Sequence, residues 1–219
     1  MDKFIDRQEA GTILADALKD YANQPNIIIL ALPRGGVPVA YEIAKALGIP
    51  LDVFIVRKLG VPGHEEFAMG AIASGGTVVF NEPLIHELNL EQSSIDHILK
   101  EEQKELQRRE LLYRGNRPFP NLLGKTIILV DDGIATGSTM FAAVKALHKH
   151  KPASLIIAVP VAAHQTCEEM KRLVDKIICP LQPINFYAVG LWYEDFSQTS
   201  DGEVIELLKK SNARIEQAM

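Results

Sequence analysis

An apolar run followed by two acids and a loop of small residues constrains this chain more than any other segment. Residues 127–140 read IILVDDGIATGSTM, and the leading apolar residues predict a buried strand. Phosphate binds to free backbone N–H groups and hydroxyls at a helix start, where the helix dipole favours negative charge. The loop supplies such groups through Gly133, Thr136, Gly137, Ser138 and Thr139. Asp131 and Asp132, fixed beside this loop, are acceptors suited to the vicinal hydroxyls of a ribose.

The two acids also have a structural interpretation, because Asp at a strand end commonly caps the next helix and satisfies loop amides. Two adjacent acids before GIATGST, with a PRGG turn at residues 33–36 one βαβ unit earlier, favour a functional interpretation. Two other nucleotide motifs are excluded. Gly124-Lys125-Thr126 is not a P-loop, because Phe119 stands where a glycine is required, and no GxGxxG follows the first predicted strand.

Length and composition indicate one ordinary globular domain. The chain has 219 residues, 47% of them apolar, and its net charge of -5 disfavours nucleic acid as a partner of the surface as a whole. Its two cysteines, Cys167 and Cys179, form no CxxC pair, which is typical of a reduced cytosolic protein without structural zinc. No apolar run approaches the ~20 residues of a membrane span. We therefore expect a cytoplasmic protein with no membrane partner.

Strands and helices alternate along the chain, which predicts an α/β fold with an open, mostly parallel sheet flanked by helices. The predicted strands are residues 26–32, 51–57, 127–130, 154–161 and 176–179, and the predicted helices between them are 36–47, 138–150 and 164–173. Ligands of such sheets bind at the carboxyl ends of the strands. The PRGG turn and the acidic pair are therefore expected to form one pocket.

Between the second and third of these strands lie a predicted lid and a charged helix. Residues 58–76 contain five glycines and little periodicity and precede a short strand at 77–80, so we expect a long mobile loop and hairpin that serves as a flexible lid. Residues 91–113 predict a solvated helix with i,i+4 pairs of acids and bases. Its cluster of Arg108, Arg109, Arg114 and Arg117 has two interpretations, a phosphate or RNA site and a salt-paired helix, and the interleaved glutamates favour the second.

The strand, acids and loop resemble the signature of the type I phosphoribosyltransferases, which is an apolar strand, two acids, two variable residues and a small-Thr-Gly-x-Ser/Thr loop. Residues 127–139 match it almost throughout, and PRGG is similar to the family's pyrophosphate loop. Gly133 departs from the pattern, since many members carry an apolar residue there. The resemblance covers essentially the entire chain and is strongest to uncharacterised predicted members that share RKLGVPGHEE and ELQRRELLYRGNRP.

The resemblance implies one domain over residues 1–219, with a lid at about 58–80 and a hood built from the N-terminal segment and about 180–219. It implies Mg²⁺-dependent transfer of 5-phosphoribose from 5-phosphoribosyl 1-pyrophosphate to a nitrogenous base, with release of pyrophosphate. Similar proteins commonly form dimers, so a homodimer is one assembly that the resemblance allows.

Site residues follow from the same resemblance. The 5'-phosphate would bind residues 135–139, that is Ala135, Thr136, Gly137, Ser138 and Thr139, while Asp131 and Asp132 would bind the ribose hydroxyls and Mg²⁺. Arg34, Gly35 and Gly36 would face the pyrophosphate, with Lys58 or Arg57 adding charge from the base of the lid. A non-proline cis peptide is expected before Arg34, and Glu194 or Asp195 is a candidate for a second Mg²⁺.

The acceptor base stays open. Tyr187 or Trp192 would stack on it, although these rings could instead fill the core of the hood. Members acting on 6-oxopurines usually place an Asp where this chain has Ala135, so a 6-oxopurine acceptor is disfavoured. The alternative function is a sensor that binds the same ribose phosphate without turnover and regulates a partner. An inactive interaction protein is disfavoured, because Arg34, both acids and the phosphate loop are all present.

Overall fold

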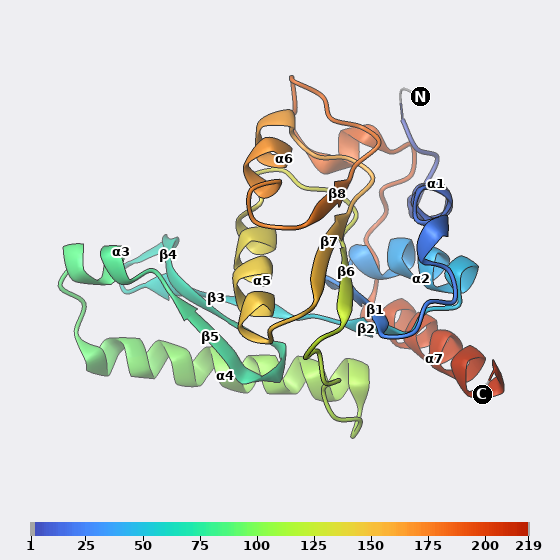
Figure 1. Cartoon of the computed structure of the whole chain (residues 1–219). Coiled ribbons are helices and arrows are strands. Elements are labelled where there is room, and N and C mark those ends of the chain that lie inside the picture. The colour runs from blue at the N-terminus through green and yellow to red at the C-terminus, as the bar shows by residue number, and fades with distance from the viewer. Residues whose placement is uncertain (1–2, 219) are drawn as a thin grey trace.

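Five parallel strands form the central sheet of the protein (Figure 1). The computed structural model describes residues 3–218, except the side chains of residues 65, 66 and 216–218. The strands are β1 (Ile27–Ala31), β2 (Leu51–Val53), β6 (Thr126–Val130), β7 (Ser154–Ala158) and β8 (Lys176–Ile178), in the order β2-β1-β6-β7-β8. All four pairings are parallel. The predicted fold class, an α/β protein with a mostly parallel sheet, is confirmed.

Helices cover both faces of this sheet because its strands are apolar on both sides. In β1, Ile27 and Ile29 pack into the core shared with α1 (Arg7–Ala17), α2 (Gly36–Leu47) and α7 (Asp201–Ala218). The alternating residues Ile28 and Leu30 pack into the opposite core, with α5 (Ser138–Lys149) and α6 (His164–Met170). The sheet is thus the middle layer of three.

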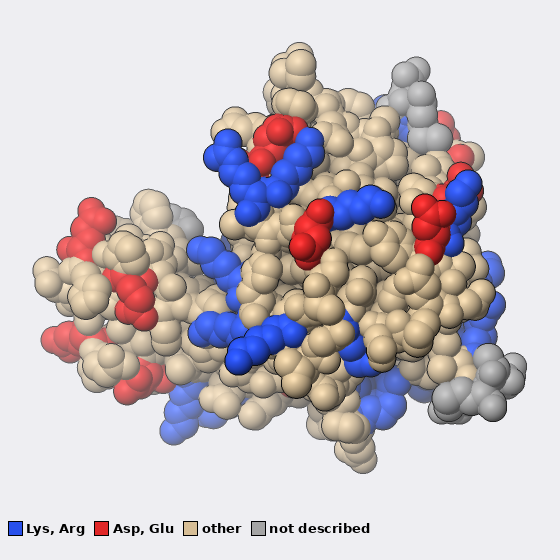
Figure 2. Space-filling view, viewed as in Figure 1, with Lys and Arg blue, Asp and Glu red and all other residues tan. Residues whose placement is uncertain are grey.

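A second, antiparallel sheet extends to one side of this body as an arm. Its strands are β3 (Val56–Val61), β4 (His64–Ala73) and β5 (Thr77–Phe80), followed by α3 (Glu82–Glu87) and the long α4 (Gln92–Arg114) beneath them. Acidic side chains gather toward the free end of the arm in Figure 2, whereas Lys and Arg gather where the arm meets the body. The net negative charge of the chain is therefore unevenly spread.

Two predictions about this region need correction. The predicted hairpin is present, but its strands β3 and β4 take up most of segment 58–76, where a long loop was also expected. The turn at Pro62-Gly63 has Gly63 at φ +74°, as a Pro-Gly turn requires. Gly70 lies within β4, where the neighbouring strand leaves no room for a side chain, because a Cβ there would lie 2.4 Å from the carbonyl oxygen of Val79. The predicted strand 51–57 is divided, because the chain leaves the parallel sheet after Val53 and starts β3 at Val56.

Both chain ends pack on the outer helices of the body. Helix α1 begins after Asp6, whose carboxylate accepts the N–H of Glu9 at 2.8 Å, and α1 and α7 both lie against α2. Neither helix was predicted as an element. No helix in residues 3–218 is both long and apolar enough to cross a membrane.

Candidate active site

The turns after β1 and β6 touch each other at the carboxyl edge of the sheet. A Cβ on Gly35 would lie 2.0 Å from Oδ2 of Asp132, and one on Gly36 would lie 2.8 Å from the carbonyl oxygen of Val130. Side chains at these positions would therefore displace the acidic pair or its strand. The peptide bond between Pro33 and Arg34 is cis, which confirms the expectation for this turn. The PRGG turn and the acids are therefore in contact, although Asp131 and Arg34 line two different cavities instead of the one pocket that was expected.

The phosphate loop forms a cavity of about 210 Å³ with one of the acids. Its lining consists of Asp131, residues 133–140 and Val189. Gly137 precedes the first residue of α5 with φ +77°, a left-handed conformation that favours glycine, and a Cβ there would lie 2.7 Å from Thr166. Ser138 and Thr139 begin the helix and are exposed. An anion could therefore reach the N-terminus of a 12-residue helix here.

Burial raises the pKa values of both acids, and their mutual repulsion adds to the rise at Asp131. Burial, and after it the neighbouring charge of Asp132, raises the pKa of Asp131 well above its usual value. Burial also raises the pKa of Asp132, but Arg7 opposes this shift. Oδ1 of Asp131 accepts the backbone N–H of Asp132 at 2.9 Å. A ligand that brings positive charge or hydroxyl donors to these carboxylates would relieve their cost of burial.

Arg7 of α1 is the cation that faces the pair. It forms a salt bridge with Oδ2 of Asp132 at 2.8 Å, and the two side chains are only 11% and 14% exposed. It also donates to the carbonyl oxygen of Ser197 at 2.7 Å, and its guanidinium lies 4.0 Å from the ring centroid of Phe196. Arg7 therefore links the N-terminal helix and the 196–197 segment to the carboxyl edge of β6.

The segment predicted as the hood packs against the acidic loop through two further residues. Tyr193 donates from its hydroxyl to the carbonyl oxygen of Asp132 at 2.6 Å, and burial raises its pKa, so it stays protonated. Val189 occupies the space above Gly133, where a Cβ would lie 2.5 Å from its Cγ1. The missing apolar side chain at position 133 is thus replaced by one that comes from a distant part of the chain.

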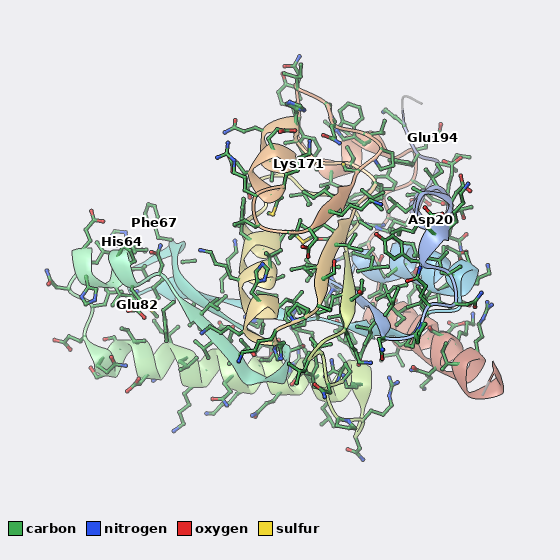
Figure 3. All side chains as sticks on the ribbon, in the orientation of Figure 1. Asp20, His64, Phe67, Glu82, Lys171 and Glu194 are labelled. Atoms are coloured by element: carbon green, nitrogen blue, oxygen red, sulfur yellow. The ribbon has the colours of Figure 1, made fainter. Side chains whose placement is uncertain are left out.

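The predicted lid lysine reaches the phosphate loop. Lys58 donates from Nζ to the hydroxyl of Ser138 at 2.7 Å. It therefore contacts the phosphate loop before α5, whereas it was expected beside the pyrophosphate. Arg57 is instead paired with Glu102 of α4 at 2.6 Å. His64 and Phe67 lie at the outer part of the arm, away from the central sheet (Figure 3).

The predicted base-stacking residues do not line the cavity of the acidic pair. Tyr187 is 86% exposed, and Trp192 stacks on Phe186 with ring centroids 6.4 Å apart. Arg34 lines a separate cavity with residues of α4 and α7. Asp195 accepts the N–H of Ser197 at 2.9 Å, which lowers its pKa.

The donor set at the acidic pair fits a magnesium ion that keeps its waters. Among the residues that the structure describes, no group of three or more His, Cys, Asp or Glu side chains comes together, so Asp195 does not join the pair. Mg²⁺ needs only one or two protein carboxylates when a phosphate-bearing substrate supplies other oxygens. Asp131 and Asp132 satisfy that requirement.

Sequence reasoning missed Arg7, Tyr193 and Val189. Arg7 stands 125 positions from its partner and has no motif around it, so no local signal identified it. Tyr193 and Val189 lie at 186–196 with the predicted base-stacking residues Tyr187 and Trp192, but no pattern in that segment separates them from their neighbours.

Comparison with known proteins identifies the family of this chain. The family model described as "Phosphoribosyl transferase domain" matches residues 5–191. "Putative phosphoribosyl transferase Rv0571c" of Mycobacterium tuberculosis is 40% identical over 212 residues, covering 97% of this chain and 48% of that protein. The chain therefore spans about half the length of the curated relatives it matches.

A solved structure is also similar over nearly the whole chain. The crystal structure of TT1426 from Thermus thermophilus is 38% identical, with a TM-score of 0.84, and the match covers 95% of this chain and 98% of that one. The five-stranded fold, the signature at β6 and the family match lead to one conclusion: this chain belongs to the phosphoribosyl transferase domain family.

Proposed function

We propose that this chain catalyses Mg²⁺-dependent transfer of 5-phosphoribose from 5-phosphoribosyl 1-pyrophosphate to a nitrogenous base, with release of pyrophosphate. The observation that carries this proposal is the contact between the PRGG turn and the acidic pair, since Gly35 leaves no room for a side chain beside Asp132. Family membership supports the reaction class. The proposal concerns this chain alone, whatever else its longer relatives contain.

Each part of the donor would meet a suitable group. The 5'-phosphate would bind the loop at residues 135–139, where exposed hydroxyls and the start of α5 favour an anion. Lys58, already bonded to Ser138, would add a positive charge there. The ribose hydroxyls would donate to Asp131 and Asp132. This placement would set C1 of the ribose at the edge where the acids meet the PRGG turn.

Catalysis would rest on positioning and on charge stabilisation at the leaving group. As the bond from C1 to pyrophosphate breaks, negative charge grows on the pyrophosphate, and Arg34 with the amides of Gly35 and Gly36 would stabilise it. Magnesium held by Asp131 and Asp132 would supply further positive charge to the diphosphate. Arg7 and Tyr193 would hold Asp132 in place without touching the reacting atoms.

The acceptor would bind beneath the hood segment. Position 135 carries an alanine, so no carboxylate there can exchange a proton with a purine ring, and we favour adenine, a pyrimidine or another nitrogen nucleophile over a 6-oxopurine. Tyr187 and Trp192 stay predicted contacts of the base. Asp195 stays a predicted metal ligand without support from the donor set.

Calorimetric titration with 5-phosphoribosyl 1-pyrophosphate and Mg²⁺, followed by a pyrophosphate-release screen across purines, pyrimidines and simple amines, tests the proposal. We expect binding and turnover with one class of base. Asp131→Asn with Asp132→Asn should abolish binding. Asp20→Asn with Glu82→Gln neutralises two exposed acids, labelled in Figure 3, that line neither the cavity of the phosphate loop nor that of Arg34, and should leave binding unchanged.

Binding without turnover across the panel would favour the sensor. Normal binding by the double acidic variant would contradict the site.

A further inference from the structure

A separate cavity of about 350 Å³ lies against the PRGG turn, and neither residue of the acidic pair is in its lining. Its lining comes from three separate segments, namely Pro33 and Arg34 after β1, Arg108, Arg109 and Tyr113 of α4, and Asp201 at the start of α7. The proposed reaction accounts for Arg34 but gives α4 no role. Two more arginines beside the turn therefore need an explanation.

One carboxylate holds the two α4 arginines side by side. Glu105 accepts two hydrogen bonds from Arg108, at 2.7 and 2.9 Å, and one from Arg109 at 2.8 Å. These bonds hold the pKa of Glu105 down to about 2, so it stays ionised. One negative charge against two guanidiniums leaves an excess positive charge. Each guanidinium has five N–H donors, and these bonds use two on Arg108 and one on Arg109.

Arg34 is even less satisfied. Its guanidinium is 3.8 Å from Oδ1 of Asp201, which is too long for a hydrogen bond. Tyr113 donates to that same oxygen at 2.5 Å, and burial and this bond raise the pKa of Tyr113 to about 12, so its proton stays in place. Within residues 3–218 the guanidinium of Arg34 makes no hydrogen bond. Its donors are available to a ligand.

A purely structural role would look different, as Arg114 of the same helix shows. Arg114 is 3% exposed and bonds Asp52, Glu110 and the carbonyl oxygen of Val53. Its donors are used within the fold. The guanidiniums of Arg108 and Arg109 bond only Glu105 in the described part of the chain, and both side chains border a cavity.

We propose that Arg108 and Arg109 of α4 join Arg34 in binding the diphosphate group of the pyrophosphate that the proposed reaction releases, and that this cavity holds that group. Arginine forks match phosphate oxygens in two-point contacts, and a cavity of this size suits a small ligand. The position of Arg34 next to Gly35 places the cavity at the leaving-group end of the turn. This inference rests on the proposed function for the source of the ligand.

Calorimetry with magnesium pyrophosphate as the titrant tests the site directly. Arg108→Gln with Arg109→Gln should weaken pyrophosphate binding by about tenfold or more, because each lost bond joins two charged groups. Lys100→Gln with Lys104→Gln, which removes two exposed cations from the same helix, should change it less than about twofold. Ribose 5-phosphate, which carries no diphosphate, should bind both variants as it binds the original protein.

One substitution should raise the affinity for pyrophosphate instead of lowering it. Asp201→Asn keeps an acceptor for Tyr113 but removes the charge that competes for Arg34, so pyrophosphate should bind more tightly. Glu206→Gln, an exposed acid of the same helix, is its control.

Equal pyrophosphate affinity in the Arg108, Arg109 double variant would overturn the site even if 5-phosphoribosyl 1-pyrophosphate still binds and turns over. Adenosine diphosphate binding more tightly than pyrophosphate would overturn the leaving-group assignment. Arginine-dependent pyrophosphate binding in a protein that does not bind the ribose substrate would support the anion site and refute the proposed function.

Discussion

Arg7 and Asp132 form a nearly buried ion pair across 125 positions of sequence, with Nε and Nη2 of the arginine 2.9 and 2.8 Å from one carboxylate oxygen. Through this pair the N-terminal helix brings a positive charge to the acidic loop. Arg7 opposes the rise in the pKa of Asp132 that burial causes. The pair is therefore both a structural link and a source of charge stabilisation that favours the ionised form of Asp132.

Arg7→Gln should lower the free energy of unfolding by about 3 kcal/mol at pH 7, because it leaves a buried carboxylate without its cation. An acid whose pKa is raised by folding destabilises the fold above its unfolded pKa, and this cost disappears as the pH falls. The loss should therefore shrink toward pH 4. Urea unfolding at both pH values measures it.

Lys45→Gln breaks an exposed ion pair and is the control, with an expected loss below about 1 kcal/mol. An Arg7→Gln loss that is equal at both pH values would show that packing, rather than charge, is what Arg7 contributes.

Asp131→Asn should raise the melting temperature at pH 7 while abolishing substrate binding. The asparagine oxygen can still accept the N–H of Asp132, but the buried charge is gone. Because folding raises the pKa of Asp131, the original protein regains this stability as the pH falls, so the gain of the variant should vanish in acid. Thermal unfolding at pH 7 and pH 4 tests this. A lower melting temperature at pH 7 would contradict the assigned cost of burial.

The fold and the centre of the site could be predicted because their signals are local. Apolar runs predicted all five parallel strands of the sheet, and the adjacency of PRGG and the acids follows from the parallel order. A hairpin was predicted at 58–76, but the length of its strands was not, because the glycines indicate loop residues although Pro62-Gly63 is a turn signal.

Long-range contacts could not be predicted in the same way. Nothing around Arg7 indicates Asp132, and nothing in the helix pattern separates the buried Arg114 from Arg108 and Arg109 at a cavity. The predicted salt pairing of that helix is confirmed, since Arg108 bonds Glu105 and Arg114 bonds Glu110. The helix pattern does not show that Arg34, from a distant turn, lines the same cavity as Arg108. Such contacts depend on how the helices and strands pack together, and no local pattern in a single sequence indicates that packing.

Gly35→Ala should cost about 1–3 kcal/mol of stability and weaken binding of 5-phosphoribosyl 1-pyrophosphate, since its Cβ would lie 2.0 Å from Oδ2 of Asp132. Gly202→Ala is a matched control in α7, where the nearest atom is 3.7 Å away. That change should stabilise the protein by up to about 1 kcal/mol, because alanine favours the helix. Chemical unfolding and calorimetry measure both effects. Unchanged binding in Gly35→Ala would refute the close contact of the two turns.

Gly133→Ala should destabilise the protein by about 1–3 kcal/mol, and Val189→Ala should recover much of that loss, because the new methyl would lie 2.5 Å from Cγ1 of Val189. A double-mutant cycle should give a coupling energy of about 0.5–3 kcal/mol. Leu181→Ala is the control partner, since it packs in the same apolar cluster without approaching Gly133. Additive effects for the Gly133 and Val189 pair would show that the 180–193 segment does not rest on the acidic loop as the structure places it, whereas coupling confined to that pair would identify Val189 as the replacement for the side chain that position 133 lacks.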